Sequence, residues 1–326
     1  MKAVVCKAWG PPESLVIEDR PALQAGAGQV VLRVKAASVK FSDTLLIQNK
    51  YQTQPELPFI PGGEVTGIVS SVGPGIESWK VGDRVNAQTT YGGYAEEVVA
   101  EADRMTAIPD SIEFAAATGL SSTYGTAYYA LVDRGRLRAG ETLLVLGAAG
   151  GVGLASVEVG KVVGAKVIAC ASSEEKLAVC RTKGADETIN YATEDMRARV
   201  KAITKGNGVD VIVDPVGGTY SEAALRDMAW GGRHLVIGFT AGDIPKIPLN
   251  LPLIKGCEIV GVWIGAFAKR EPAKHRTNAQ TLWQWMAQGK IKPYISATYP
   301  LERVADALNA LTERKVAGKV VLTPEA

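Results

Sequence analysis

A glycine-rich turn behind a short apolar run could bind the phosphates of a dinucleotide. In the stretch TLLVLGAAGGVG at 142–153, Ala148, Gly150 and Gly153 follow the spacing G-x-G-x-x-G, with alanine in the first position. Small residues there let the backbone approach a pyrophosphate, and a helix that begins at the turn offers unpaired N–H groups to the anion. Because a chain with 35 glycines contains such spacings by chance, the flanking elements must decide whether the turn is a binding site.

Strands and helices alternate around this turn. Apolar runs predict six strands, and helical periodicity predicts the connections between them. The strands are expected at 143–146, 166–171, 187–190, 209–214, 233–239 and 258–263, and the helices at 152–163, 174–183, 196–204 and 220–228. This order is typical of an α/β Rossmann fold, a doubly wound parallel sheet that binds the pyrophosphate at its first strand–helix junction. The turn lies at that junction, so we interpret it as a dinucleotide site.

The end of the next strand indicates which dinucleotide is bound. NAD-specific folds usually place a carboxylate there for the ribose 2′-hydroxyl, whereas this strand ends at Ser172 and Ser173 and is followed by Lys176. Hydroxyl groups and a lysine can accept a 2′-phosphate that a carboxylate would repel. We interpret Glu174 and Glu175 as first-turn residues that complement a helix dipole, with either serine as the cap. The strand end therefore favours NADPH over NADH.

Composition limits the other function classes. A chain of 326 residues with 47% hydrophobic and 21% charged residues is long enough for two ordinary globular domains. A net charge of +2 gives no field that would attract nucleic acid or an anionic membrane. No apolar run reaches about 18 residues, the length of a membrane span, and the first stretch, MKAVVC, is expected to be a strand and not a signal peptide. The four cysteines are scattered, which favours a reducing, cytoplasmic setting.

Two further regions flank the Rossmann pattern. Up to about residue 122, short strands broken by glycine and proline predict an antiparallel, barrel-like domain with one short helix at 41–48. After the sixth strand, amphipathic helices at 277–288 and 301–314 and a strand at 320–322 are expected to return to that first domain. The predicted boundaries are 1–124 for the first domain, 125–262 for the Rossmann domain and 263–326 for the returning segment.

Catalysis by side chains alone is poorly supported. His234 and His275 are the only histidines, and neither has a cysteine close in sequence, so the clustered ligands of a zinc site are lacking. His234 falls inside a buried strand pattern and is expected to be structural. No nucleophile elbow or Ser-His-Asp order is visible. The sequence thus predicts no metal and leaves the chemistry to the cofactor, while the protein positions the reactants.

Motifs along the whole chain give it a family resemblance. They are PGGEVTG at 61–67, VGDRV at 81–85, GGYAE at 92–96, TAYYAL at 126–131, AAGGVG at 148–153, DPVGG at 214–218 and GKVVL at 318–322. On these motifs the chain resembles the zinc-free quinone oxidoreductase (zeta-crystallin-like) branch of the medium-chain dehydrogenase/reductase superfamily. Zinc-dependent relatives carry histidine where Gly63 stands here, so the resemblance agrees with the lack of a zinc ligand set in the sequence.

The resemblance implies a GroES-like catalytic domain around the Rossmann domain, with the active site in the cleft. It implies contacts to NADPH at the pyrophosphate, the adenosine phosphate, the body of the dinucleotide and the nicotinamide. In that order, these residues are Gly150, Gly151 and Val152; Ser172, Ser173, Lys176 and Tyr191; Val216 and Gly217; and Phe239, Thr240 and Thr126, with Lys319 as a C-terminal cofactor contact. The resemblance also implies a homodimer through the edge strand 258–263, while an internal edge covered by a helix stays open as the alternative.

One departure from the family pattern concerns the acceptor. The family commonly has Asn-Phe-x-Asp after its third strand, with the asparagine facing the nicotinamide pocket, and here the stretch is Lys40-Phe41-Ser42-Asp43. Lys40 could donate to a substrate carbonyl or bind an anionic group, or else pair with Asp43 or point to solvent. Tyr51 matches a tyrosine that the family places near the cleft, and it is a candidate proton donor or substrate stacker.

These observations lead to one main function hypothesis and two alternatives. The main hypothesis is an NADPH-dependent reductase that transfers a hydride to a quinone or an α,β-unsaturated carbonyl compound, with both reactants aligned in a dry site. The first alternative is a short-chain enoyl-CoA reductase, in which Lys40 would meet a CoA phosphate. The second is a crystallin-like or RNA-associated binding protein without catalysis, which the near-neutral charge and the lack of a basic run argue against.

Overall fold

The computed structural model describes residues 1–324, and the chain divides into two compact units. The terminal unit contains residues 1–122 and the segment from residue 292 onward, and the central unit contains residues 123–291. The chain thus returns to the terminal unit at residue 292, whereas the sequence predicted a return at 263. The difference arises because the helices that follow the sixth strand of the Rossmann pattern pack within the central unit.

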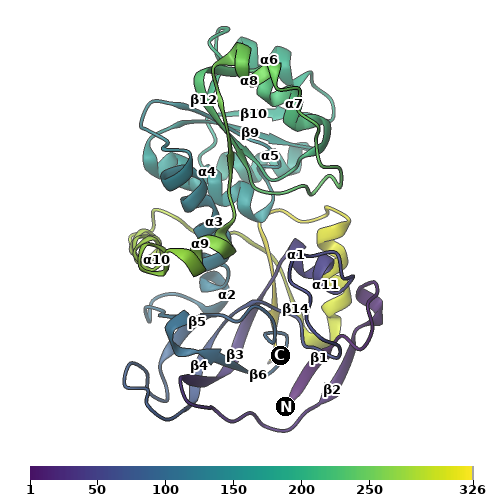
Figure 1. The fold of residues 1–326 in the computed structure, drawn as a ribbon, viewed down its shortest axis with the longest axis vertical. Helices are drawn as coiled ribbons and strands as arrows, with labels where there is room; N and C mark the ends of the chain where they lie inside the picture. The colour runs from purple at the N-terminus through teal and green to yellow at the C-terminus, as the bar shows by residue number, and fades with distance from the viewer. Residues whose placement is uncertain (325–326) are drawn as a thin grey trace. The chain divides into compact units, whose positions relative to one another are not determined.

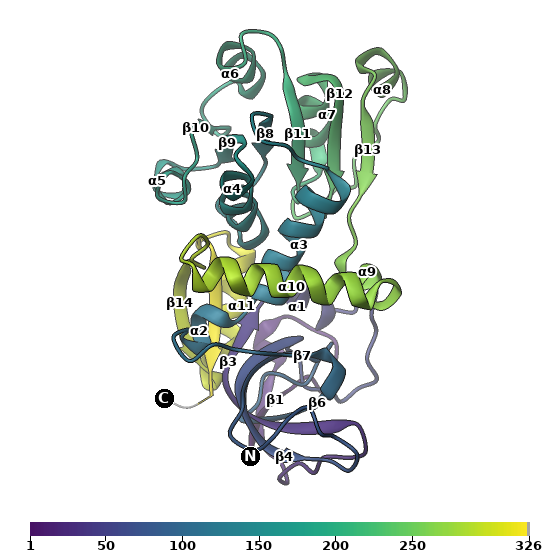
Figure 2. The same cartoon turned by 90° about the vertical axis from the view of Figure 1, so that its left-hand side faces the viewer.

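The central unit is built on a six-stranded parallel sheet in the order β10-β9-β8-β11-β12-β13, which Figure 2 shows from one side. The strands are β8 (Thr142–Val145), β9 (Lys166–Ala171), β10 (Glu187–Asn190), β11 (Val209–Asp214), β12 (Met228–Val236) and β13 (Glu258–Gly261). The sheet grows in both directions from β8, so the carboxyl end of β8 lies at the switch point where doubly wound sheets bind ligands. The Rossmann prediction is confirmed.

Helices with apolar faces pack on this sheet. They are α4 (Gly151–Val163), α5 (Glu174–Thr182), α6 (Met196–Ile203), α7 (Gly218–Arg226) and α8 (Asn250–Lys255). Val200, Leu225 and Leu251 from three of these helices share one core with Leu144 and Ile212 from the central strands. Burial of apolar area is the main force that holds such layers together.

Two more helices, α9 (Ile264–Arg270) and α10 (Pro272–Ala287), complete the central unit. They pack against the segment that leads into β8, which contains α3 (Gly125–Tyr128) and the π-helical turn η4 (Tyr129–Arg134) (Figure 2). Phe267 stacks on Tyr129 with ring centroids 4.1 Å apart. Trp285 lies 5.4 Å from Tyr128 between ring centroids, and Trp283 is buried. These aromatic contacts retain α9 and α10 in the central unit.

The terminal unit is built on a seven-stranded, mostly antiparallel sheet in the order β14-β15-β3-β4-β5-β7, with β6 paired to β3. Its strands are β3 (Gln29–Val39), β4 (Glu64–Val72), β5 (Arg84–Gln88), β6 (Glu97–Glu101), β7 (Met105–Ala107), β14 (Ile295–Pro300) and β15 (Lys319–Thr323), and a separate hairpin joins β1 (Lys2–Val5) and β2 (Val16–Asp19). The long strand β3 pairs with β4 along one edge and with both β6 and β15 along the other. This pairing curves the sheet around a core, so the prediction of a barrel-like domain is confirmed.

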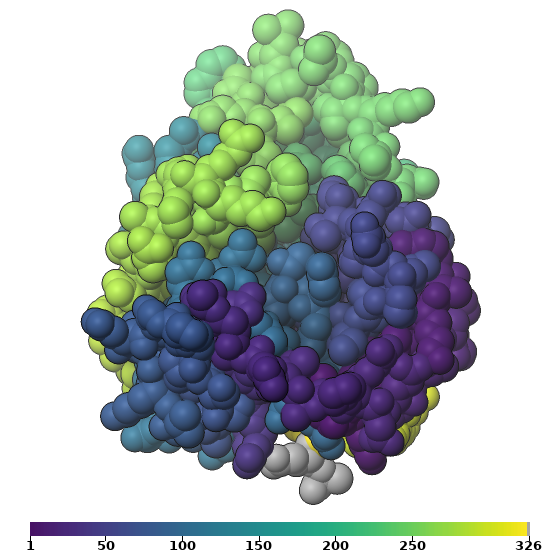
Figure 3. Space-filling view, turned by 60° about the horizontal axis from the view of Figure 1, so that its bottom comes forward, coloured from purple at the N-terminus to yellow at the C-terminus, as the bar shows by residue number. Residues whose placement is uncertain are grey.

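Short helices close the terminal unit. They are α1 (Phe41–Leu46), α2 (Phe114–Ala117) and α11 (Val304–Thr312), with helical turns at Pro12–Ser14, Ala102–Arg104, Leu120–Tyr124 and Leu301–Arg303. Helix α11, in yellow in Figure 1, packs against α1, and Leu46 and Leu308 from these helices share the core with Leu32 from β3. Figure 3 shows one face of the molecule, on which the first residues of the terminal unit, in purple, lie beside residues that come later in the same unit, in blue. Among residues 1–324, no helix is both long and apolar enough to cross a bilayer.

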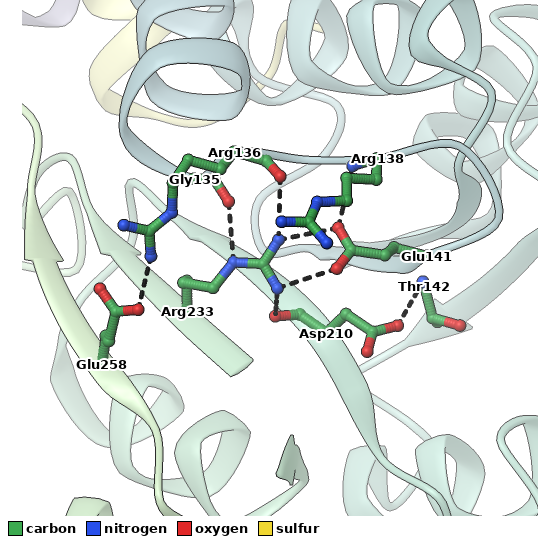
Figure 4. Close-up of polar contacts among 8 residues, drawn as sticks. All are labelled: Gly135, Arg136, Arg138, Glu141, Thr142, Asp210, Arg233 and Glu258. Atoms are coloured by element: carbon green, nitrogen blue, oxygen red, sulfur yellow. Dashed lines mark hydrogen bonds and ion pairs between the residues drawn. The ribbon is translucent and has the colours of Figure 1, made fainter. Parts of the chain in front are cut away.

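A buried arginine of the central unit, Arg233, forms hydrogen bonds with residues that lie at or before the amino ends of β8 and β11 (Figure 4). Arg233 on β12 donates from Nη1 and Nη2 to the two carboxylate oxygens of Glu141, at 3.0 and 2.7 Å. It also donates to the carbonyl oxygens of Gly135, Arg136 and Asp210. The cluster borders a concavity of about 380 Å³. Because the guanidinium is engaged by the unit's own acceptors, we interpret this cluster as structural.

Candidate functional site

The turn between β8 and α4 has the geometry of a phosphate cradle. Gly147 adopts a φ of +57°, and a Cβ on Gly153 would lie 2.2 Å from the Gly147 carbonyl oxygen, so both positions require glycine. Helix α4 begins after Gly150, which has no side chain to cap it. The first N–H groups of α4 therefore lack a side-chain acceptor and can attract an anion. Ala148 is buried, and its N–H donates to the carbonyl of Cys170 at 2.8 Å, so alanine fits the first glycine position.

The end of β9 places a hydroxyl group and an ammonium group together. Lys176 Nζ lies 3.4 Å from Ser172 Oγ. Ser173 caps α5, because its Oγ accepts a hydrogen bond of 3.4 Å from the Lys176 N–H. Glu174 is turned toward Arg181, with which it forms an exposed ion pair of 2.6 Å. Ser172 and Lys176 therefore provide the groups that a 2′-phosphate needs, and Glu174 has the role of a first-turn residue.

A second glycine turn follows β11. Asp214 Oδ1 accepts hydrogen bonds of 2.9 Å from the N–H groups of Val216 and Gly217, and Gly217 adopts a φ of +75°. Asp214 Oδ2 accepts from the Ser221 hydroxyl and lies 3.0 Å from Nε2 of His234. Burial acts to raise the pKa of Asp214, but the hydrogen bonds to His234, Gly217 and Ser221 bring it below its usual value. His234 thus supports the turn, as the sequence predicted for a structural histidine.

The two glycine turns and the end of β12 lie next to one another. A Cβ on Gly147 would lie 2.8 Å from Val216 Cγ2. A Cβ on Gly217 would lie 2.8 Å from Phe239 Cδ1, so the aromatic ring rests against the second turn. Thr240 donates from its N–H and its hydroxyl, each at 3.1 Å, to the carbonyl at position 215 in the same turn. The structure therefore gathers these predicted cofactor residues at the carboxyl ends of three strands.

Two other predicted cofactor residues of the central unit come from other elements. Tyr191 directly follows β10 and packs on Tyr220 of α7, with ring centroids 4.8 Å apart. Thr126 lies in α3 and is buried. Lys40, Tyr51 and Lys319 belong to the terminal unit. The predicted residues thus divide into a cofactor set, found mainly in the central unit, and an acceptor set in the terminal unit.

Lys40 stands at the start of α1, beside a buried carboxylate. Asp43 Oδ2 accepts hydrogen bonds of 2.9 Å from the Lys40 backbone N–H and of 2.7 Å from the Tyr94 hydroxyl. Burial raises the pKa of Asp43, against the opposing effect of Lys40 and these hydrogen bonds. The Lys40 ammonium group lies beside Gly63, since a Cβ there would be 3.1 Å from Nζ. Lys40 therefore bonds to Asp43 through its backbone, while its ammonium group occupies the space that the glycine leaves. Tyr51 is half-buried and packs on the core of the terminal unit.

Lys319 is buried in the terminal unit, with Nζ 2.8 Å from Ser38 Oγ. A Cβ on Gly119 would lie 1.7 Å from the same Nζ, so glycine at this position makes room for the ammonium group. Burial is the main cause that lowers the pKa of Lys319 to about 8. A lysine with such a pKa can change its charge under physiological conditions.

Sequence reasoning missed a second buried carboxylate, Glu64 at the start of β4. Its Oε1 accepts hydrogen bonds from the Asn86 side chain at 3.1 Å and from the N–H groups of Gly119 and Ser121 at 3.0 and 3.2 Å. Its Oε2 accepts from the Ser122 hydroxyl. A signal was present, because an acid directly before the apolar run VTGIV is expected to be buried only with partners.

Among residues 1–324, no three His, Cys, Asp or Glu side chains gather in a metal-binding arrangement. The four cysteines, Cys6, Cys170, Cys180 and Cys257, are free thiols. Burial raises the pKa of Cys170 and raises that of Cys180 to about 12, so these two thiols remain protonated.

Similarity to known proteins extends along the whole chain. Residues 26–110 match the family described as alcohol dehydrogenase GroES-like domain, and residues 151–287 match the family described as zinc-binding dehydrogenase. The quinone oxidoreductase-like protein 2 homolog of Nematostella vectensis is 41% identical over 98% of this chain and 88% of its own length. A probable oxidoreductase from Mycobacterium abscessus is 37% identical, with a TM-score of 0.90 over 99% of each chain. The Escherichia coli quinone oxidoreductase, in complex with NADPH, is 29% identical, with a TM-score of 0.91 over 99% of this chain and 100% of its own.

Proposed function

This chain belongs to the quinone oxidoreductase branch of the medium-chain dehydrogenase/reductase superfamily, and on that premise we propose that it is an NADPH-dependent reductase of quinones or α,β-unsaturated carbonyl compounds. The observation that carries the proposal is the pair of features at the carboxyl ends of β8 and β9. The start of α4, without a side-chain cap, fits a pyrophosphate, and Ser172 with Lys176 fits a 2′-phosphate. The NADPH complex of the Escherichia coli relative supports the same cofactor here.

The proposed cofactor residues follow the dinucleotide from its adenosine end to its nicotinamide end. They are Ser172, Ser173, Lys176 and Tyr191 at the adenosine phosphate, Gly150, Gly151 and Val152 at the pyrophosphate, Val216 and Gly217 along the body, and Phe239, Thr240 and Thr126 at the nicotinamide, with Lys319 as a contact implied by resemblance alone. NADPH, when bound, supplies the hydride that the acceptor receives.

The acceptor is proposed to meet side chains of the terminal unit. The Lys40 ammonium group, beside Gly63, would donate a hydrogen bond to the acceptor oxygen and stabilise the negative charge that develops there. Tyr51 or water would supply the proton that completes the reduction. We propose that the reaction needs no zinc, because glycine and lysine at positions 63 and 40 offer no ligand set of the kind that zinc prefers.

The central test is NADPH oxidation with a panel of quinones, enones and enoyl-CoA thioesters. Turnover on quinones or enones is the expected result, and nucleotide binding without turnover on any acceptor would refute the enzymatic proposal.

The Lys176→Ala variant is expected to raise the KM for NADPH about tenfold and to leave the KM for NADH nearly unchanged, because the lysine pairs only with the 2′-phosphate. Lys166→Ala, an exposed lysine at the other end of β9, is the matched control.

Two alternatives remain as outcomes of related assays. In the first alternative, the Lys40 ammonium group would bind a CoA phosphate, so Lys40→Asn would weaken the binding of enoyl-CoA thioesters selectively. Equal effects of this variant on small quinones would argue against the CoA reading. A salt-dependent shift with RNA, without turnover of any acceptor, would favour a binding protein, although the net charge of +2 makes this outcome unexpected.

We also propose a homodimer through β13. This strand is at the edge of the parallel sheet, and Ile259 and Trp263 are 44% and 63% exposed, which suits pairing with a second copy better than an internal edge under a helix. Ile259→Lys is expected to convert dimer to monomer in sedimentation, with Lys255→Glu as a charged control at the end of α8. A wild-type protein that sediments as a monomer at all concentrations would contradict the proposal.

We propose a cytoplasmic location, which the four free thiols support because the cytoplasm keeps cysteines reduced.

A further inference from the structure

Four charged side chains of the terminal unit form one electrostatic cluster. Glu64 and Asp43 supply two carboxylates, and Lys319 and Lys40 supply two ammonium groups, with Lys319 coupled to the other three. Lys319 and both carboxylates are buried, whereas Lys40 is partly exposed beside Gly63. Lys40 is therefore the member through which this cluster meets its surroundings.

The fold determines where the Lys319 ammonium group lies. Lys319 is the first residue of β15, which pairs with β3 so that Val321 stands opposite Ser38. The Nζ atom lies 2.8 Å from Ser38 Oγ, and the missing side chain of Gly119 leaves the space for it. The charge is thus held at Ser38 near the end of β3, two residues before Lys40 at the start of α1.

We propose that Lys319 is a positioning residue for acceptor reduction, whose buried ammonium group holds the segment 38–43 and adds positive potential at Lys40. The inference rests on the proposed function, in which Lys40 meets the acceptor oxygen. In the low dielectric of a protein interior, a charge acts over several ångströms. A charged Lys319 therefore strengthens the stabilisation of a negative acceptor oxygen by Lys40 without touching the acceptor.

The charge on Lys319 depends on pH within the working range of an enzyme. Burial lowers its pKa to about 8, and the like charge of Lys40 acts in the same direction, while Glu64 and Asp43 oppose both. Tyr94, which donates to Asp43, has a pKa well above its ordinary value because it is buried, so it remains neutral. Lys319 is thus charged below about 8 and neutral above it, and the added potential is lost as the pH rises.

The first test is the pH profile of NADPH-dependent reduction of a 1,4-naphthoquinone. In the wild type, kcat/KM for the quinone is expected to fall about tenfold as the pH rises through the pKa of Lys319. Lys319→Arg keeps its charge, so its kcat/KM for the quinone should stay at the high value over the whole pH range. Lys319→Met has no charge, so its kcat/KM should stay at the low value over the same range. Lys315→Met removes an exposed lysine four residues earlier and should leave the wild-type profile unchanged.

Two outcomes of this test overturn the inference. One is a fall with pH that persists in both Lys319 variants. The other is a Lys319→Met effect confined to the KM for NADPH, which would indicate that Lys319 acts on the cofactor alone and not on acceptor reduction. If Lys319→Met does not fold, Lys319→Arg decides alone, since only a permanently charged side chain is needed to remove the fall.

The second test does not depend on turnover. In protein labelled with 13Cε-lysine, the resonance that is missing from Lys319→Arg reports the titration of Lys319 by NMR. The titration midpoint is expected at about 8, and it should rise in Lys40→Asn because a neighbouring like charge is removed. An ordinary lysine midpoint of 10.5 that does not respond to Lys40→Asn overturns the inference. The expected titration without turnover of any acceptor would contradict the proposed function alone.

Discussion

The two units of this protein each bury a basic side chain, and they treat its charge differently. In the central unit, the Arg233 guanidinium binds both oxygens of Glu141 and three backbone carbonyls (Figure 4). In the terminal unit, Lys319 bonds to Ser38, and its countercharge Glu64 is engaged by hydrogen bonds from other residues. Arginine stays protonated and uses its planar fork, whereas lysine is a point charge whose pKa shifts on burial. The comparison distinguishes a charge that stabilises the fold from a charge that can titrate.

The largest effect is expected from removal of the central charge. Arg233→Met removes the guanidinium that binds both carboxylate oxygens of Glu141 and three carbonyl groups, which should lower the free energy of unfolding by about 3–5 kcal/mol. Urea unfolding measures this loss. Arg136→Met breaks an exposed ion pair with Glu258 in the same cluster and should cost at most about 1 kcal/mol. Equal losses in the two variants would show that burial of Arg233 adds nothing.

The next effect concerns the pH dependence of stability that Lys319 confers. Its pKa is about 8 in the folded chain and 10.5 for an ordinary lysine, so the unfolded chain binds more protons between these values. The free energy of unfolding should therefore rise with pH across this window, by up to about 3 kcal/mol from this group. Unfolding measured at several pH values should show the rise in the wild type and lack it in Lys319→Arg. Parallel curves for the two proteins would contradict the assignment.

The smallest effect separates crowding from backbone strain around Lys319. Gly119 and Gly140 both adopt a φ of +84°, but a Cβ on Gly119 would lie 1.7 Å from Lys319 Nζ, whereas a Cβ on Gly140 meets no atom within 4 Å. Gly119→Ala should therefore cost about 1–3 kcal/mol more than Gly140→Ala. Thermal or urea unfolding of both variants measures the difference. If the two costs are equal, the lysine can move aside, and the space left by Gly119 does not fix its position.

The fold was largely predictable because its signals are local. The six parallel strands and the glycine turn at Ala148–Gly153 were identified from apolar runs and from the spacing of small residues. The boundary between the central unit and the returning segment was predicted at 263, but the structure has it at 292. The position depends on whether α9 and α10 leave the central unit, and this is decided by contacts between rings far apart in sequence, such as Phe267 and Tyr129. Periodicity shows that a helix has an apolar face and not which surface covers that face.

The sequence by itself was enough to predict a phosphate site at the small-residue turn of 147–153 and at the serine and lysine after β9. Both predictions depend on residue types within a few positions of one another, where steric and hydrogen-bonding rules apply directly. Lys40 was singled out by its departure from the family pattern. Only the tertiary structure decided that Lys319 is buried on Ser38, 281 positions away. It also decided that Glu64 and Asp43 share its environment, because the burial and pKa of a charge depend on strands that the chain brings together from distant segments.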